Sequence, residues 1–157
     1  MQALAFVAAG LVAALVATAV AMRMFVGRAQ DRLARTLLEA PGASYRLLTR
    51  AELCGNGRHR RFPGVVGLTD AAIVFHGVFG ETGTLPTEAI QKIVTGTRLA
   101  DGRTLLRREV LRLTRRGGEE TQYVVSRASA SAWRSHLGLW AVEERRAAMD
   151  VVAPGKR

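Results

Sequence analysis

The sequence contains little cysteine, histidine or aromatic side chain, and each shortage excludes a class of protein. Its 157 residues include one cysteine, Cys54, which excludes an internal disulfide framework and a multi-cysteine zinc site. Three histidines, at positions 59, 76 and 136, stand far apart with no Cys, Asp or Glu at ligand spacing. Aromatic residues make up only 6% of the chain. We therefore expect neither a metal site nor a cofactor.

The sequence also lacks the motifs that nucleophilic or phosphate chemistry needs. No serine lies in a Gly-x-Ser-x-Gly elbow. The glycines at 77, 80 and 83 lack the strand–loop–helix context and the Lys-Ser/Thr ending of a phosphate-binding loop, so they indicate hairpins and bulges. No activating pattern surrounds Cys54, which favours a buried and unreactive thiol. We expect that the protein is not an enzyme.

Acidic residues are scarce relative to basic ones: 13 Asp and Glu stand against 23 Lys and Arg, a formal net charge of +10. The basic residues form short scattered groups that do not interleave with aromatic residues, unlike a stacking platform for single strands. No helix-turn-helix, zinc-finger or RNP-like pattern accompanies them. Attraction to an anionic membrane surface explains this charge with fewer assumptions. We expect no nucleic-acid partner.

The first 22 residues carry no charged side chain. A helix over residues 3–22 would be about 30 Å long, which matches the hydrocarbon core of a bilayer. A soluble helix of this length would show a polar face, and this one has none. The sequence therefore predicts a transmembrane anchor over residues 1–26, with the lipid bilayer as a partner.

Arginines follow the span and none precede it, which predicts the orientation. Arg23, Arg28, Arg32 and Arg35 would lie in the cytoplasm, because basic flanks stay inside. The amino terminus is then outside, and the rest of the chain lies at the inner face of the plasma membrane. The alternative is a cleaved signal peptide, since two Ala-x-Ala patterns occur over residues 17–21. The missing basic start, the long apolar run and the arginine that follows favour a retained anchor.

Residues 27–42 are interpreted as a juxtamembrane helix and linker. Asp31 can pair with Arg35 along such a helix. Two interpretations remain open: a solvated linker helix, or an interfacial helix that holds the following domain near the lipid. A Pro-Gly pair at its end stops the helix. Its apolar face consists of Ala29, Leu33 and Leu37.

Residues 43–141 change to the short period of strands. Brief apolar or alternating runs are separated by turns rich in Gly, Asn, Asp and Pro, which indicates an antiparallel barrel or sandwich of about seven strands. The clearest hairpin has its turn at Gly117-Gly118, and a strand is expected to open at Leu105-Leu106. The other expected strands cover residues 45–54, 65–68, 72–75, 89–94, 110–114 and 121–126, and residues 84–86 lead the chain into the strand over 89–94.

The carboxyl end returns to helical period. Trp133, Leu137 and Trp140 fall at i, i+4 and i+7 and form one apolar stripe. A small bent sheet leaves an open apolar end, and such a helix can cover it. The fold class is therefore mainly β, with a carboxyl-terminal capping helix and one amino-terminal transmembrane helix. Residues 142–157 are expected to be the end of the capping helix and a disordered tail.

Four segments of this region resemble bacterial pleckstrin-homology-like and GRAM-like domains. The resemblance extends over about residues 43–140 and is strongest to membrane-tethered actinobacterial members. It implies seven strands in two nearly orthogonal sheets, a capping helix whose tryptophan is matched by Trp133, and no established chemistry. The segments are GLTDAAIVF (67–75), LPTEAIQKI (85–93), VLRLTRRGG (110–118) and SAWRSHL (131–137).

The same resemblance implies a candidate lipid surface. In phosphoinositide-binding members of this superfold, basic residues around the first strands and their loop hold lipid phosphates. The lipid-binding signature of eukaryotic members is not reproduced, so no headgroup follows, and solvated loop charges are the alternative. The residues that correspond by position are Arg46, Arg50, Arg58, Arg60 and Arg61.

These observations predict a membrane-anchored, non-catalytic module that binds a protein or lipid at the inner face of the plasma membrane. Anionic lipid headgroups and a membrane or cytoplasmic protein are the expected partners. Two alternatives remain. The chain would be an accessory subunit of a transport or export complex if the span recruits it, or a secreted or periplasmic domain if the span is cleaved.

Overall fold

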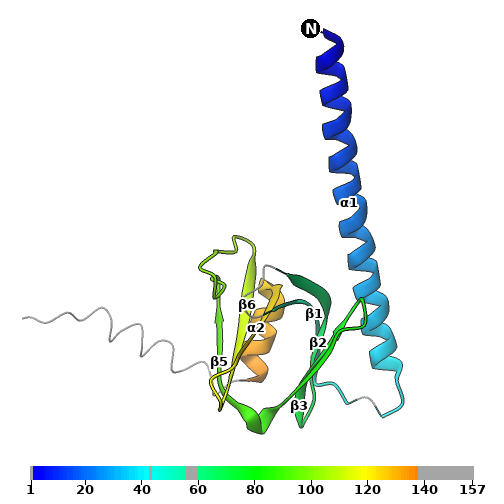
Figure 1. The fold of residues 1–157 in the computed structure, drawn as a ribbon. Helices are drawn as coiled ribbons and strands as arrows, with labels where there is room; N and C mark the ends of the chain where they lie inside the picture. Colours follow the sequence, from blue (N-terminus) through cyan, green and yellow to red (C-terminus); the bar gives the residue numbers. More distant parts are fainter. Residues whose placement is uncertain (1, 43, 56–59, 138–157) are drawn as a thin grey trace, which may run out of the picture.

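The protein consists of a long amino-terminal helix, a bent antiparallel sheet of seven strands and a short carboxyl-terminal helix (Figure 1). The structure is a computed structural model, and it describes residues 2–42, 44–55 and 60–137. These elements confirm the predicted fold class. The amino-terminal half of the long helix stands away from the sheet, whereas its other half lies beside the sheet.

Helix α1 (Gln2–Glu39) is one continuous helix of 38 residues. The span and the juxtamembrane helix, expected as separate elements, therefore form a single rod, because no proline interrupts them. Within Ala9–Glu39, an 18-residue window has a mean hydropathy of 2.0 and no part of it is buried. The helix is long and apolar enough to cross a membrane. It ends before Pro41, and Gly42 then adopts a φ of +79°, which glycine tolerates at no steric cost.

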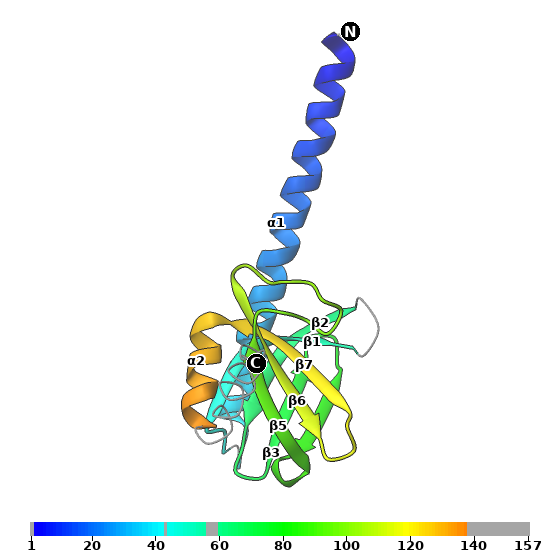
Figure 2. The same ribbon diagram turned by 90° about the vertical axis from the view of Figure 1, so that its left-hand side faces the viewer.

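The seven strands pair in the order β4-β3-β2-β1-β7-β6-β5, and every neighbouring pair is antiparallel. The resemblance implied two sheets, but residues 51–54 of β1 pair with β7 while the whole of β1 pairs with β2. This shared strand joins the two arms into one bent sheet (Figure 2). The strands are β1 (Leu47–Cys54), β2 (Arg61–Leu68), β3 (Ala72–Gly77), β4 (Thr82–Pro86), β5 (Ile90–Gly96), β6 (Arg108–Arg115) and β7 (Glu120–Ser126).

The β6–β7 hairpin forms where it was predicted, and Gly118 in its turn has a φ of +82°. The prediction that a strand begins at Leu105 is wrong, because β6 begins at Arg108. This stretch belongs to the β5–β6 connection and makes a single bridge, between Arg98 and Thr104. Leu105 packs on a small apolar cluster on the outer face of the sheet, whereas Leu106 is 85% exposed. The two leucines thus have opposite environments instead of continuing a strand.

Helix α2 (Arg127–His136) covers the open end of the bent sheet. Trp133 is fully buried in the main core, and its Nε1–H donates a hydrogen bond to Thr49 Oγ1 at 3.0 Å. Leu137 packs against the same core. The predicted cap is therefore confirmed for these two residues. Trp140 and the expected tail over residues 142–157 lie outside the described residues.

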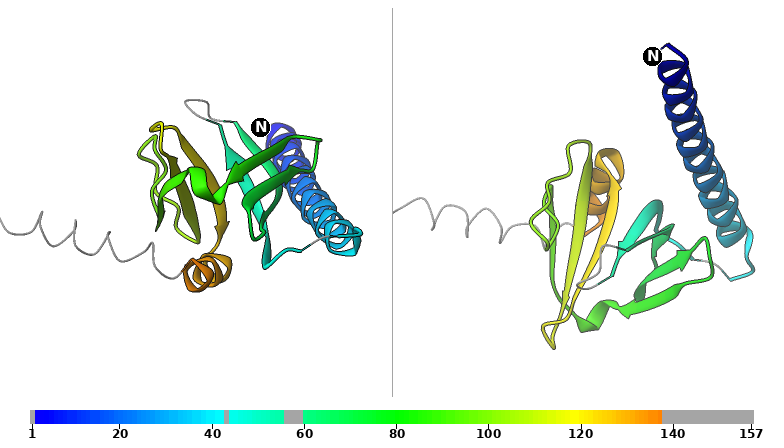
Figure 3. Two further views of the ribbon diagram at one scale, coloured as in Figure 1. Left: turned by 90° about the horizontal axis from the view of Figure 1, so that it is seen from below. Right: turned by 45° about the horizontal axis from the view of Figure 1, so that its top comes forward.

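The second half of α1 packs on the outer face of β1 and β2, while α2 lies between the two arms of the sheet (Figure 3). The apolar face of residues 27–42 is thus half-buried against the domain, and the interfacial position of this helix stays a prediction. Asp31 pairs with Arg50 of β1 rather than with Arg35. The half-buried apolar residues on this face include Ala29, Leu33 and Leu37.

Candidate functional site

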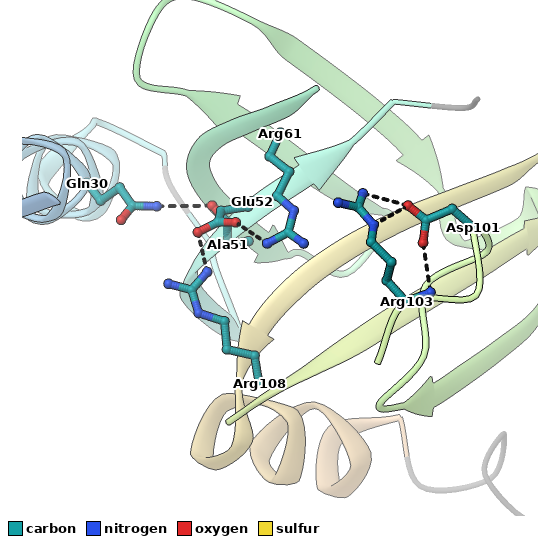
Figure 4. Close-up of polar contacts among 7 residues, drawn as sticks. All are labelled: Gln30, Ala51, Glu52, Arg61, Asp101, Arg103 and Arg108. Atoms are coloured by element: carbon teal, nitrogen blue, oxygen red, sulfur yellow. Dashed lines mark hydrogen bonds and ion pairs between the residues drawn. The ribbon is translucent and has the colours of Figure 1, made fainter. Parts of the chain in front are cut away.

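The junction between α1 and the sheet depends on a buried polar side chain, Gln30, which is 8% exposed. Its Nε2 donates hydrogen bonds to the backbone oxygens of Ala51 at 3.0 Å and Gly64 at 2.8 Å. Ala51 and Gly64 face each other in the β1–β2 register. One amide therefore satisfies two carbonyls that belong to different strands, and it fixes the helix on the sheet at a defined residue. Figure 4 shows the contact with Ala51.

An ion pair also fixes the rotation of the helix near this contact. The Nε–H of Arg50 donates to Asp31 Oδ1 at 2.7 Å, directly after Gln30 in the chain. Gly27, one turn earlier, lies beside the guanidinium, since a Cβ there would be at an ordinary contact distance of 3.7 Å from Arg50 Nη1. Three residues of α1 thus contact or accommodate the outer face of β1 and β2.

Beside this junction, one carboxylate binds two guanidinium groups. Glu52 of β1, whose side chain is 22% exposed, pairs with Arg108 at the start of β6 and with Arg61 at the start of β2, the latter at 3.5 Å. Figure 4 shows both arginines pointing toward this carboxylate, with the Asp101–Arg103 ion pair of the β5–β6 connection close by. The cluster carries more positive than negative charge, because one acid faces two bases.

A groove of about 930 Å³ separates α1 from the strands beside this cluster. On the helix side, its residues follow one another at spacings of three and four, so they belong to a single face. On the sheet side, it is bounded by β1, β7, the first residues of β2 and β6, and the amino-terminal end of α2. The helix residues that line it are Ala19, Met22, Arg23, Val26, Gly27 and Gln30.

The structure does not bring the five predicted arginines together. Arg46 lies beyond the start of β1, and Arg61 lies opposite the end of that strand. The eight residues between these ends span about 26 Å at 3.3 Å per residue. Arg58 lies outside the described residues, and Arg60 is exposed. The other three form the ion pairs Arg46–Asp70, Arg50–Asp31 and Arg61–Glu52.

Sequence reasoning missed Gln30, Arg23 and Arg108 as members of this region. Gln30 lies in a polar stretch of helix and carries no local signal that it is buried. Arg23 was interpreted only as a topology signal, and Arg108 only as one of the scattered basic residues. One signal in the sequence could have indicated this groove. Residues 19, 22, 23, 26, 27 and 30 lie on one face of the helix, and that face changes from apolar to polar along its length.

Burial shifts the pKa of three further titratable groups in this domain. Burial raises the pKa of the Cys54 thiol, although nearby Arg61 acts in the opposite direction. Burial lowers the pKa of His76, whose Nε2 lies 3.4 Å from the Tyr45 hydroxyl. Burial also raises the pKa of Tyr123 to about 12. Within the described ranges, no three His, Cys, Asp or Glu side chains gather as metal ligands would.

Comparison with known proteins identifies a related fold. No family model matches the sequence, and no curated protein matches it. Among solved structures, the chain is similar to the C-terminal domain of an unknown protein from Leishmania infantum, with a TM-score of 0.51 and 7% sequence identity. That similarity covers 70% of this chain and 95% of the other. At this identity, the similarity shows the fold alone.

Proposed function

We propose that the protein is a membrane-anchored pleckstrin-homology-like domain of the bacterial, actinobacterial type. It acts as a non-catalytic module for protein or lipid interaction at the inner face of the plasma membrane. The observation that carries the proposal is the unbroken helix that links an apolar, unburied segment to a fixed contact on the sheet. A flexible linker would let the domain diffuse around its anchor, whereas this junction holds one end of the sheet toward the bilayer.

The end of the sheet nearest the apolar half of α1 has features of a membrane-facing surface. The groove brings Met22 of the helix to the same level as the starts of β2 and β6. Because the sheet is antiparallel, the β3–β4 and β5–β6 connections lie at this same end. Each of them exposes one large apolar side chain, Phe79 at 66% and Leu106 at 85%. Such side chains favour the lipid interface when a span already holds them there.

The orientation can be tested with the full chain in its cell of origin. Because arginines follow the span, a reporter that is active only in the cytoplasm should be active when fused after Arg157. A reporter that is active only outside should be inactive at the same site. The control is a variant in which the basic flank is moved to the other side of the span. It changes Arg23, Arg28 and Arg32 to Gln and adds three Lys before Gln2, and it should reduce or reverse the preference for the cytoplasmic orientation. Activity of the external reporter in the unaltered chain would contradict the proposal.

The interaction role can be tested by crosslinking from exposed positions. A photoreactive residue at Leu106 should capture lipid or a protein at the membrane surface, whereas one at exposed Arg116, in the turn at the other end of the sheet, should capture far less lipid. A photoreactive residue at the exposed position Leu15 reports which molecules contact the span itself. Capture of one large membrane protein from Leu15 alone would favour the accessory-subunit alternative over an independent module.

A further inference from the structure

We propose that the groove between α1 and the sheet binds one anionic phospholipid. The inference rests on the proposed membrane anchoring, because the groove lies where the apolar half of α1 meets the domain. In this arrangement the phosphate contacts Arg23 and the Arg61–Arg108 pair. One acyl chain follows α1 back toward the bilayer, past Met22 and Ala19. The occupant is thus a lipid of the surrounding leaflet and not a soluble anion.

The electrostatic part of the inference comes from the charges that line the groove. Arg23 meets no acidic partner within the described chain, whereas Arg61 and Arg108 share the carboxylate of Glu52. A fourth arginine, Arg50, also lines the groove and is paired with Asp31, so four guanidinium groups and two carboxylates leave two positive charges in excess. Arginine forks match phosphate oxygens in pairs, and charge-assisted hydrogen bonds of this kind are stronger than neutral ones. A monoanionic phosphodiester fits this excess.

The beginning of α2 adds donors at the same place. Ser126 and Ser129 line the groove, and Ser126 caps the helix by accepting a hydrogen bond from the Ser129 backbone N–H at 3.1 Å. Their hydroxyl groups lie 2.8 Å apart. The positive end of the helix dipole therefore lies on the sheet side of the groove, beside Arg108, which faces Ser126 in the β6–β7 register. These groups increase the preference for an anion that the arginines already create.

The apolar part comes from the continuity of one helix face. Ala19, Met22 and Val26 line the groove and belong to the same face as Arg23 and Gly27. The first two lie within the uncharged segment that is long enough to cross a membrane, so this wall extends into the hydrocarbon region. On the sheet side, the half-buried Pro63 supplies apolar surface. A ligand with a charged head and an apolar tail matches both halves.

Gly27 makes the groove testable by filling it without changing any charge. A Cβ at Gly27 would meet only Arg50 Nη1, at an ordinary contact distance of 3.7 Å. Gly27→Leu therefore places a side chain in the groove with no backbone clash, and leucine is also the better helix former. Arg23→Gln removes the unpaired charge and keeps a polar side chain of similar length. Arg116→Gln, an exposed position in the β6–β7 turn, is the matched control.

The experiment uses the full chain in nanodiscs of equal parts dioleoylphosphatidylglycerol and dioleoylphosphatidylcholine. After gentle extraction, native mass spectrometry counts the lipids retained per chain. We expect about one phosphatidylglycerol retained in preference to phosphatidylcholine. This preference should fall roughly tenfold in Arg23→Gln, the usual effect of losing a charge-assisted hydrogen bond. A similar fall is expected in Gly27→Leu, because the groove is filled, whereas Arg116→Gln should behave as the unaltered chain.

Each other outcome overturns the inference. Equal retention of the two lipids would show that the groove does not select an anionic headgroup. Full retention in a Gly27→Leu chain with an unchanged circular dichroism spectrum would show that the lipid contacts the domain elsewhere by general attraction. A chain that does not enter the nanodiscs would contradict the membrane anchoring itself. Incorporation and lipid preference are separate measurements, so the two failures are distinguishable.

Discussion

The indole of Trp133 connects α2 to the sheet both by packing and by a hydrogen bond. It is fully buried, and its N–H donates to Thr49 in β1. Trp133→Ala removes this packing and leaves a cavity, so we expect a loss of about 3–5 kcal/mol in the free energy of unfolding. Urea unfolding of the detergent-solubilised chain, followed by near-ultraviolet circular dichroism, measures it.

Two further variants separate packing from hydrogen bonding at this position. Trp133→Phe keeps much of the ring volume and loses the donor, so its cost should be clearly smaller than that of the alanine variant. Thr49→Val removes the acceptor and should destabilise by about 1 kcal/mol. An alanine variant with an unchanged unfolding midpoint would contradict the role of α2 as a cap.

His76 gives the domain a predicted pH dependence. Burial lowers its pKa below the ordinary value of 6.5, so the unfolded chain binds the proton more readily than the folded one. Stability is therefore present above the ordinary pKa and is lost as pH falls through the lowered one. Comparison of unfolding midpoints at about pH 7.5 and about pH 5 should show a smaller decrease in His76→Gln than in the unaltered chain. Equal decreases would show that other groups cause the dependence.

Cys54 should react slowly with alkylating reagents at neutral pH. The thiolate is the reactive form, and burial raises the pKa of this thiol. We expect iodoacetamide to modify it more slowly than it modifies free cysteine, as measured by mass spectrometry over time. Arg61→Gln should slow the reaction further, because Arg61 lowers the same pKa. A rate in that variant above the rate of the unaltered chain would contradict this electrostatic account.

At the scale of secondary-structure elements, Gln30 determines where α1 attaches to the sheet. Gln30→Ala leaves the carbonyls of Ala51 and Gly64 without this donor in a buried position. We expect a loss of about 1–3 kcal/mol and faster amide hydrogen exchange in the second half of α1 and in β1 and β2. Thr36→Ala, which removes an exposed hydrogen bond within the same helix, is the control and should change neither measurement. Unchanged exchange in the Gln30 variant would mean that packing alone holds the helix.

The sequence predicted the strands and the cap better than the position of α1. Alternating runs such as residues 110–114 mark strands locally, because a half-buried strand exposes every second side chain. The burial of Trp133 followed from a stripe at helical spacing. The contact of Gln30 with two strands did not, because the residues it joins lie 21 and 34 positions further along the chain. The strand predicted to begin at Leu105 was wrong for a related reason. Local hydrophobicity cannot distinguish a strand from a loop that folds back onto the sheet.

The sequence predicted the positive charge of the candidate site but not which residues form it. Basic residues near a membrane were expected, and Arg61 is one of those that line the groove. Its companions, Arg23 and Arg108, lie 38 positions before it and 47 positions after it by residue number, so only the fold assembles them. Ion pairs that engage several predicted arginines depend on partners such as Asp31 and Asp70, which no spacing rule connects to β1.

At the scale of the whole molecule, the two ends of the sheet differ in a way that suits a membrane surface. The end beside the apolar half of α1 carries Phe79, Leu106 and the arginine groove. The opposite end carries the β2–β3 turn, where Arg46 and Asp70 neutralise each other, and the β6–β7 turn, where Arg115 pairs with Glu119. The positive excess in the groove and the exposed apolar residues thus share one end.

The unbroken helix between Arg23 and Gln30 also couples the angular position of the span to that of the domain. Each residue turns an α-helix by about 100° and advances it by 1.5 Å. One alanine inserted after Phe25 should therefore swing Met22 and Arg23 away from the sheet and reduce phosphatidylglycerol retention. Seven inserted residues complete nearly two turns, so they should restore the facing while raising the span by about 10.5 Å. Partial recovery with seven residues, but none with one, would show that rotational phase, and not tether length, is what this helix transmits.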